Sequence, residues 1–115
     1  MKLETKKIMA KITIWGYVTA CDPGINNLSS YKGSIDVSDL KPDQDLTTLP
    51  DDHWWKSDIA YKFGKLTFVE LRPDGALFRY GEREILAPYG ADTNKKVDEV
   101  GLSYAYAEIY VQVEK

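Results

Sequence analysis

The chain has 115 residues, of which 43% are hydrophobic and 29% charged, and its net charge is -3. These values are typical of one globular domain, here residues 1–115, and exclude wholesale disorder. The negative net charge also argues against nucleic-acid binding, which requires clustered Lys and Arg side chains.

The composition indicates a cytoplasmic protein. A single cysteine, Cys21, excludes an internal disulfide and fits a reducing compartment. The N-terminal segment lacks the continuous apolar run of a signal peptide, and no run approaches the length of a membrane span. We therefore expect no membrane partner.

Residues 7–21 alternate between two unlike faces, which predicts a β-strand. One face is small and apolar, and Ile12, Ile14 and Val18 on it are predicted core residues. The other face carries Trp15 and Tyr17 among polar residues. A turn is expected at residues 22–27, followed by a strand over residues 30–37.

Residues 38–50 are loop-like, and one short helix is predicted near residues 50–56. Thr47 or Thr48 would cap it, and Asp51 and Asp52 would complement the positive end of its dipole. A strand would follow this helix.

The second half of the chain predicts more strands. Residues 65–72 and 76–80 flank the turn sequence Arg72-Pro-Asp-Gly75, which predicts a hairpin, and residues 82–87 predict another strand. The polar residues 88–101 are expected to form a surface loop.

The last strand mirrors the first. Residues 102–115 alternate strictly, with Ile109, Val111 and Val113 on the predicted core side. If the two terminal strands pair, the opposite sides of both combine into an aromatic face, consisting of Trp15, Tyr17, Tyr104, Tyr106 and Tyr110. This face would be covered by a second layer, or would bind a partner protein, a sugar or a second copy of the chain.

These elements together predict a mainly β, single-domain antiparallel β-sandwich or small barrel. It would have about six to seven strands and one short helix near residues 50–56. An α+β roll is the second choice.

The negative charge is concentrated in residues 33–58, which carry seven aspartates against two lysines. This acidic segment lies beside a Trp-Trp pair, and tryptophans dominate binding hot spots. The candidate partner-binding residues are Asp43, Asp45, Asp51, Asp52, His53, Trp54 and Trp55.

The same residues do not form a recognisable metal or catalytic motif. Asp43-x-Asp45 lacks the glycine and terminal glutamate of a calcium loop, so no metal is expected. His53 has no nucleophile motif to serve, so no catalytic residue is assigned. Without a glycine-rich phosphate motif, no cofactor is expected.

We therefore expect a non-enzymatic cytosolic protein-binding domain, such as a small acidic inhibitor, antidote or adaptor that masks a basic surface of its target. One alternative is a carbohydrate-binding β-sandwich that uses the aromatic face, and a second is a small enzyme centred on His53. A homodimer formed through a strand face is a further expectation.

Overall fold

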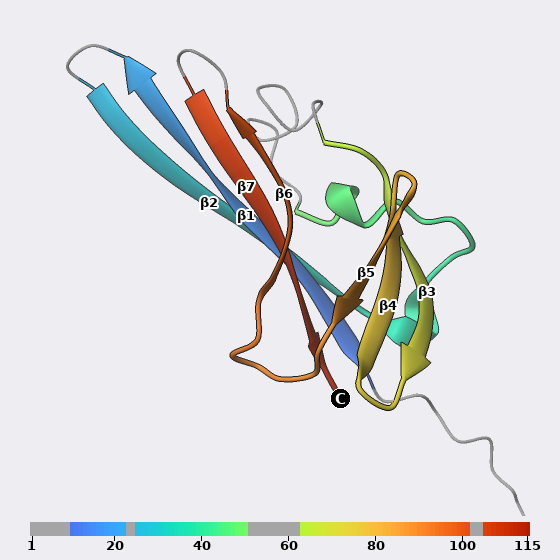
Figure 1. Cartoon of the computed structure of the whole chain (residues 1–115). Helices are drawn as coiled ribbons and strands as arrows, with labels where there is room; N and C mark the ends of the chain where they lie inside the picture. The colour runs from blue at the N-terminus through green and yellow to red at the C-terminus, as the bar shows by residue number, and fades with distance from the viewer. Residues whose placement is uncertain (1–9, 23–24, 51–62, 102–104) are drawn as a thin grey trace, which may run out of the picture.

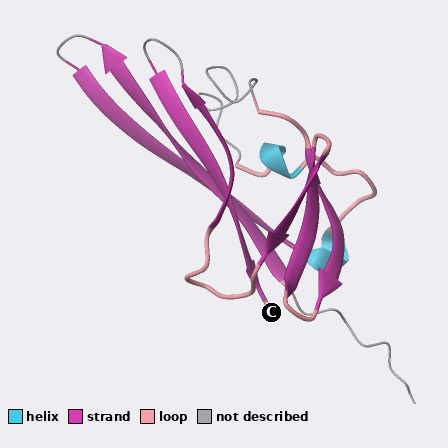
Figure 2. Cartoon of the chain, in the orientation of Figure 1, coloured by secondary structure: helices cyan, strands magenta, loops and turns pink. Residues whose placement is uncertain are grey.

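The chain folds into two antiparallel β-sheets that pack face to face (Figure 1). The computed structural model describes residues 10–22, 25–50, 63–101 and 105–115. The described residues form seven strands: β1 (Lys11–Asp22), β2 (Ile25–Asp36), β3 (Leu66–Arg72), β4 (Gly75–Tyr80), β5 (Arg83–Ala87), β6 (Lys95–Gly101) and β7 (Ala105–Glu114). Two single 3₁₀ turns, η1 (Val37–Asp39) and η2 (Leu46–Thr48), are the helical elements of the described residues (Figure 2).

The larger sheet has four strands in the order β2-β1-β7-β6. The first and last of these strands are therefore central neighbours, so the pairing on which the common aromatic face depends is present. Their register places Ile12 opposite Val113 and Ile14 opposite Val111, so the two apolar faces point to the same side. The β1–β2 hairpin continues this pairing over the whole length of both strands.

The smaller sheet has the order β3-β4-β5 and is built from two successive hairpins. The predicted turn between Arg72 and Gly75 joins β3 to β4, because Pro73 presets the backbone angle of the first central turn position. The sandwich-like, mainly β architecture is thus confirmed.

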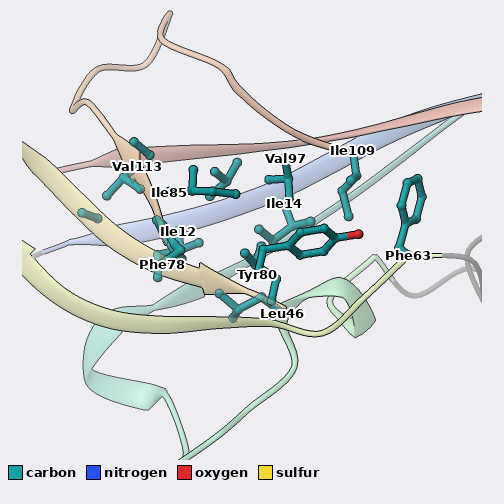
Figure 3. Packing of buried hydrophobic residues seen from close by; sticks show 14 of the residues in the cluster. Ile12, Ile14, Leu46, Phe63, Phe78, Tyr80, Ile85, Val97, Ile109 and Val113 are labelled. Atoms are coloured by element: carbon teal, nitrogen blue, oxygen red, sulfur yellow. The ribbon is translucent and has the colours of Figure 1, made fainter. Parts of the chain in front are cut away.

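The core lies between the two sheets (Figure 3). The predicted core residues are all fully buried: Ile12, Ile14, Val18, Ile109, Val111 and Val113. The smaller sheet contributes Phe78, Tyr80 and Ile85 from the opposite side. In Figure 3, the Tyr80 hydroxyl points toward the end of the cluster occupied by Phe63.

A partly buried polar contact joins the two sheets at this end of the core. The Tyr80 hydroxyl donates to Asp98 Oδ2 at 2.6 Å and accepts from the Gly64 amide at 2.7 Å. Burial, and next the bond to Asp98, raises the pKa of Tyr80 to about 12. This hydroxyl therefore stays protonated and ties β4 to β6 and to the chain leading into β3.

The connection from β2 to β3 crosses closely over the larger sheet. A side-chain carbon built on Gly33 would lie only 2.3 Å from the Leu49 carbonyl oxygen, so only glycine fits there. Leu46 in η2 is fully buried and anchors the same connection to the core.

Three sequence predictions require correction. Residues 88–101 are not a loop throughout, because β6 occupies Lys95–Gly101 and completes the larger sheet. The strand predicted over residues 30–37 spans Ile25–Asp36, so it begins inside the turn expected at residues 22–27, which is shorter than predicted. The helix predicted near residues 50–56 and the strand after it fall almost entirely outside the described residues. Thr47 and Thr48, its expected caps, lie inside η2, which is capped by Asp45.

Candidate functional site

The aromatic face lies on the outer side of the larger sheet, away from the core. Because β1 and β7 pair, Trp15 is opposite Tyr110, Tyr17 is opposite Glu108 and Thr19 is opposite Tyr106. Directly opposed residues in an antiparallel pair share one face, so the pairing gathers these side chains. The four described aromatic residues of this face, Trp15, Tyr17, Tyr106 and Tyr110, are all half-buried. Tyr104 lies outside the described residues.

The rings form two cross-strand pairs. Trp15 stacks on Tyr110 with ring centroids 4.5 Å apart and planes at 8°, while Tyr17 meets Tyr106 at 6.5 Å and 53°. The Trp15 indole N–H donates to Asn94 Oδ1 at 2.9 Å, which fixes the indole orientation. Each ring therefore has a defined position.

Glu108 lies at the centre of the aromatic face and is only 8% exposed. It sits two residues from both Tyr106 and Tyr110 on one strand, so all three side chains point to the same side. Both tyrosine hydroxyls donate to the Glu108 carboxylate, one to each oxygen. Lys96 on β6 is a third partner of the Glu108 carboxylate, with its Nζ 3.2 Å from Glu108 Oε2.

These bonds shift the ionisation of the whole cluster. Hydrogen bonds from Tyr106, and next from Tyr110, lower the pKa of Glu108 to about 2. The bond to Glu108 raises the pKa of Tyr17 to about 12, and it likewise raises the pKa of Tyr106 and Tyr110. At neutral pH the cluster therefore consists of one carboxylate and three protonated phenols.

A second carboxylate extends the cluster toward the β6 edge. Lys96 Nζ lies 2.5 Å from Glu99 Oε1, and the Tyr106 hydroxyl lies 3.1 Å from the same oxygen. The bond to Glu99, and next the bond to Glu108, raises the pKa of Lys96, while Lys96 lowers the pKa of Glu99. The face thus combines fixed aromatic rings with a charged network.

Sequence reasoning found the aromatic residues but missed Glu108, Lys96, Glu99 and Asn94. Glu108 had a visible signal, because the alternation places it between Tyr106 and Tyr110 on one face. Lys96, Glu99 and Asn94 belong to the segment expected to be a loop, so their position beside the tyrosines was not foreseen.

The structure describes two of the predicted acidic partner-binding residues. Asp43 is exposed and has a left-handed backbone with φ 57°. Asp45 has a structural role: its Oδ1 accepts hydrogen bonds from the Thr47 amide, the Thr47 hydroxyl and the Leu66 amide. It thereby joins η2 to the start of β3. The remaining five, Asp51, Asp52, His53, Trp54 and Trp55, lie outside the described residues.

The parts of the chain that the structure describes contain neither a candidate metal site nor a helix that could cross a membrane. Within these residues, no group of three His, Cys, Asp or Glu side chains is arranged to hold a metal ion. No helix among them is long and apolar enough to cross a membrane.

Comparison with known proteins gives no further assignment. No protein-family model matches the chain, and no curated protein or solved structure is significantly similar to it.

Proposed function

We propose that this chain is a non-enzymatic protein-binding domain that contacts its partner through the aromatic face. The observation that carries the proposal is the ring of hydroxyl and ammonium groups around Glu108, which holds the aromatic side chains in fixed positions. A surface whose side chains are already ordered loses less conformational entropy when it binds. Tyrosine and tryptophan supply large contact areas at low entropic cost.

The chemistry of the cluster favours binding over catalysis. The Glu108 carboxylate is already bonded to tyrosine hydroxyls and to Lys96, and its low pKa makes it a poor proton acceptor. The tyrosine hydroxyls have raised pKa values, which makes them poor nucleophiles at neutral pH. These groups therefore support a structural role for the network within a binding surface.

We expect the partner to be a protein with a basic surface. The seven aspartates against two lysines in residues 33–58 give the chain an acidic region, which would speed the approach of a basic partner. This chain would then act in the cytoplasm as a small acidic inhibitor, antidote or adaptor that masks the basic surface of its target.

The carbohydrate alternative is less well supported by the ring geometry. Sugar rings stack on an open aromatic ring, but Trp15 and Tyr110 stack on each other, so each ring has one face covered. The enzyme alternative rests on His53, which lies outside the described residues.

The test begins with capture of partners from the native host by the full chain, followed by direct affinity measurement with the purified partner. Trp15→Ala and Tyr17→Ala should each weaken binding by about 30-fold, equal to about 2 kcal/mol, if these rings are anchors. Val69→Ala is the control, because Val69 is 42% exposed and lies on the other sheet. It should bind normally.

Two results would redirect the proposal. Normal binding by both aromatic-face variants, with loss in Asp51→Asn or Trp54→Ala, would move the contact to the acidic segment. Specific binding of the chain to a glycan array, abolished by Trp15→Ala, would favour the carbohydrate alternative.

A further inference from the structure

The described part of the chain has four edge strands, and three of them carry features that hinder pairing with another chain. A register shift interrupts β3 between Phe68 and Glu70, and another interrupts β6 between Lys96 and Asp98. β5 has only five residues. Bulges and short edges protect sheets against unwanted pairing. In contrast, β2 pairs with β1 over twelve residues with no register shift.

The hydrogen-bond pattern shows which backbone groups of β2 face its open edge. The Val37 amide donates to the Ala10 carbonyl at 2.9 Å, in the same register as the β1–β2 pairs. Hydrogen-bonded and non-hydrogen-bonded pairs alternate along an antiparallel ladder. Val37 belongs to a hydrogen-bonded pair, so Ser34, three residues away, belongs to a non-hydrogen-bonded pair. The Ser34 amide and carbonyl therefore point away from β1. Its hydroxyl lies 2.9 Å from the Thr13 hydroxyl, which agrees with the close side-chain approach at such pairs.

The exposed side chains near this edge have opposite charges with a two-fold arrangement. Lys32 and Asp36 are exposed, lie two residues on either side of Ser34, and form no ion pair with another described residue. In an antiparallel pair of two β2 strands centred on Ser34, Lys32 of each copy lies opposite Asp36 of the other. A register centred on Lys32 would instead oppose like charges, which is unfavourable.

We propose that β2 pairs with β2 of a second copy of this chain, with a two-fold axis at Ser34, so that residues 32–36 of the two copies pair and the contact ends where η1 begins. The two larger sheets would then form one continuous eight-stranded sheet, since each contributes four strands. A closed two-fold contact satisfies both open edges at once. Because the axis is perpendicular to the sheet, the two aromatic faces lie on the same side. The dimer does not depend on the proposed function, and it would present two such faces to a partner.

The decisive measurement is sedimentation equilibrium of the full chain from micromolar to millimolar concentration. The wild type should show a monomer–dimer equilibrium. Lys32→Glu and Asp36→Lys should each weaken dimerisation by about tenfold, because two cross-strand pairs become repulsive. The double variant, with both charges exchanged, should restore wild-type association. A wild type that stays monomeric, single variants that dimerise normally, or a double variant that does not recover would each overturn the proposal.

A backbone variant tests the edge independently of charge. Ser34→Pro removes the amide that points to the open edge, and proline is tolerated on edge strands. It should abolish the dimer, whereas Ser34→Ala, which loses the same hydroxyl but keeps the amide, should dimerise normally. Circular dichroism confirms that each variant is folded. If Ser34→Pro does not fold, the charge exchange decides alone, and if it folds and still dimerises the contact is not at this edge.

Discussion

Trp15 and Tyr110 form a parallel ring stack between the first and last strands of the chain, with centroids 4.5 Å apart and planes at 8°. The two residues face each other in the β1–β7 register. The stack therefore joins the two ends of the sequence on the outer side of the sheet, while the apolar side chains of the same strands join them in the core.

A double-mutant cycle measures the contribution of this stack. Aromatic pairs contribute about 0.5–1.5 kcal/mol beyond their area burial. We expect Trp15→Ala and Tyr110→Ala to show a coupling free energy in this range by urea unfolding. The pair Trp15→Ala and Phe68→Ala is the control, because Phe68 lies in the other sheet and should be additive with Trp15. Full additivity of Trp15→Ala with Tyr110→Ala would show that the stack contributes nothing.

Glu108 should make the folded protein lose stability as the pH falls into the acidic range. Its pKa is about 2 in the folded protein, below its ordinary value of 4.5, so the folded state favours the carboxylate. This stabilisation is present above about pH 4.5 and is lost as the pH falls toward 2. Melting temperatures of the wild type and Glu108→Gln should therefore converge between these pH values.

The control for this measurement is Glu84→Gln. Glu84 forms an exposed ion pair with Arg79 on the smaller sheet, at 3.5 Å. Exposed pairs of this kind contribute little to stability. Glu84→Gln should thus follow the wild-type melting profile, and a Glu108→Gln profile that also follows it would contradict the role assigned to Glu108.

Asp45 and Asp43 should differ in their effect on stability although both are acidic loop residues. Asp45→Ala removes the cap of η2 and leaves the Leu66 amide, next to a fully buried side chain, without its acceptor. We expect a loss of about 2–3 kcal/mol in chemical unfolding. Asp43→Asn, at an exposed position, should change stability by less than about 0.5 kcal/mol. Equal effects of the two changes would contradict the structural role assigned to the hydrogen bonds that Asp45 accepts.

Gly33 should tolerate no side chain. In Gly33→Ala the added carbon would meet backbone atoms of Leu49 and Pro50, which cannot rotate away. The connection to η2 would have to shift, at a cost of about 3 kcal/mol by denaturant unfolding. Gly101→Ala is the matched control, because its added carbon would lie 3.7 Å from the Tyr106 ring. A wild-type stability for Gly33→Ala would mean that the crossing is not closely packed.

The core prediction rests on the two central strands. Ile14 on β1 and Ile109 on β7 are fully buried. Truncation to alanine at either position should cost about 2–5 kcal/mol, through lost hydrophobic transfer and a remaining cavity. Losses below about 1 kcal/mol at both positions would show that the faces were assigned incorrectly.

The fold was predictable where alternation is regular and unpredictable where it is broken. Ile12, Ile14, Val111 and Val113 follow a strict period of two, so their burial could be inferred from the sequence alone. β6 was missed because it is an edge strand with exposed Lys95 and Lys96, and because its bulge interrupts the alternation.

The candidate site was predictable only in part for the same reason. The aromatic residues of β1 and β7 lie on regular strands, so their common face could be inferred. The contact between Lys96 and Glu108 depends on how β6 aligns with β7, and the register shift after Lys96 cannot be read from the sequence. The sequence predicts Asp45 as a partner-binding residue because it belongs to the acidic segment, and its bond to the distant Leu66 amide cannot be read from the sequence.

The pairing of β1 with β7 has a consequence for synthesis of the protein. During synthesis, β1 and β2 leave the ribosome before β7 has been made. Until β7 pairs with it, β1 has an open edge and its isoleucine and valine side chains are not covered. Folding must wait for a contact between distant parts of the sequence, which makes it slow and exposes the nascent chain to aggregation. The period before β7 emerges is therefore when this chain would most need a chaperone.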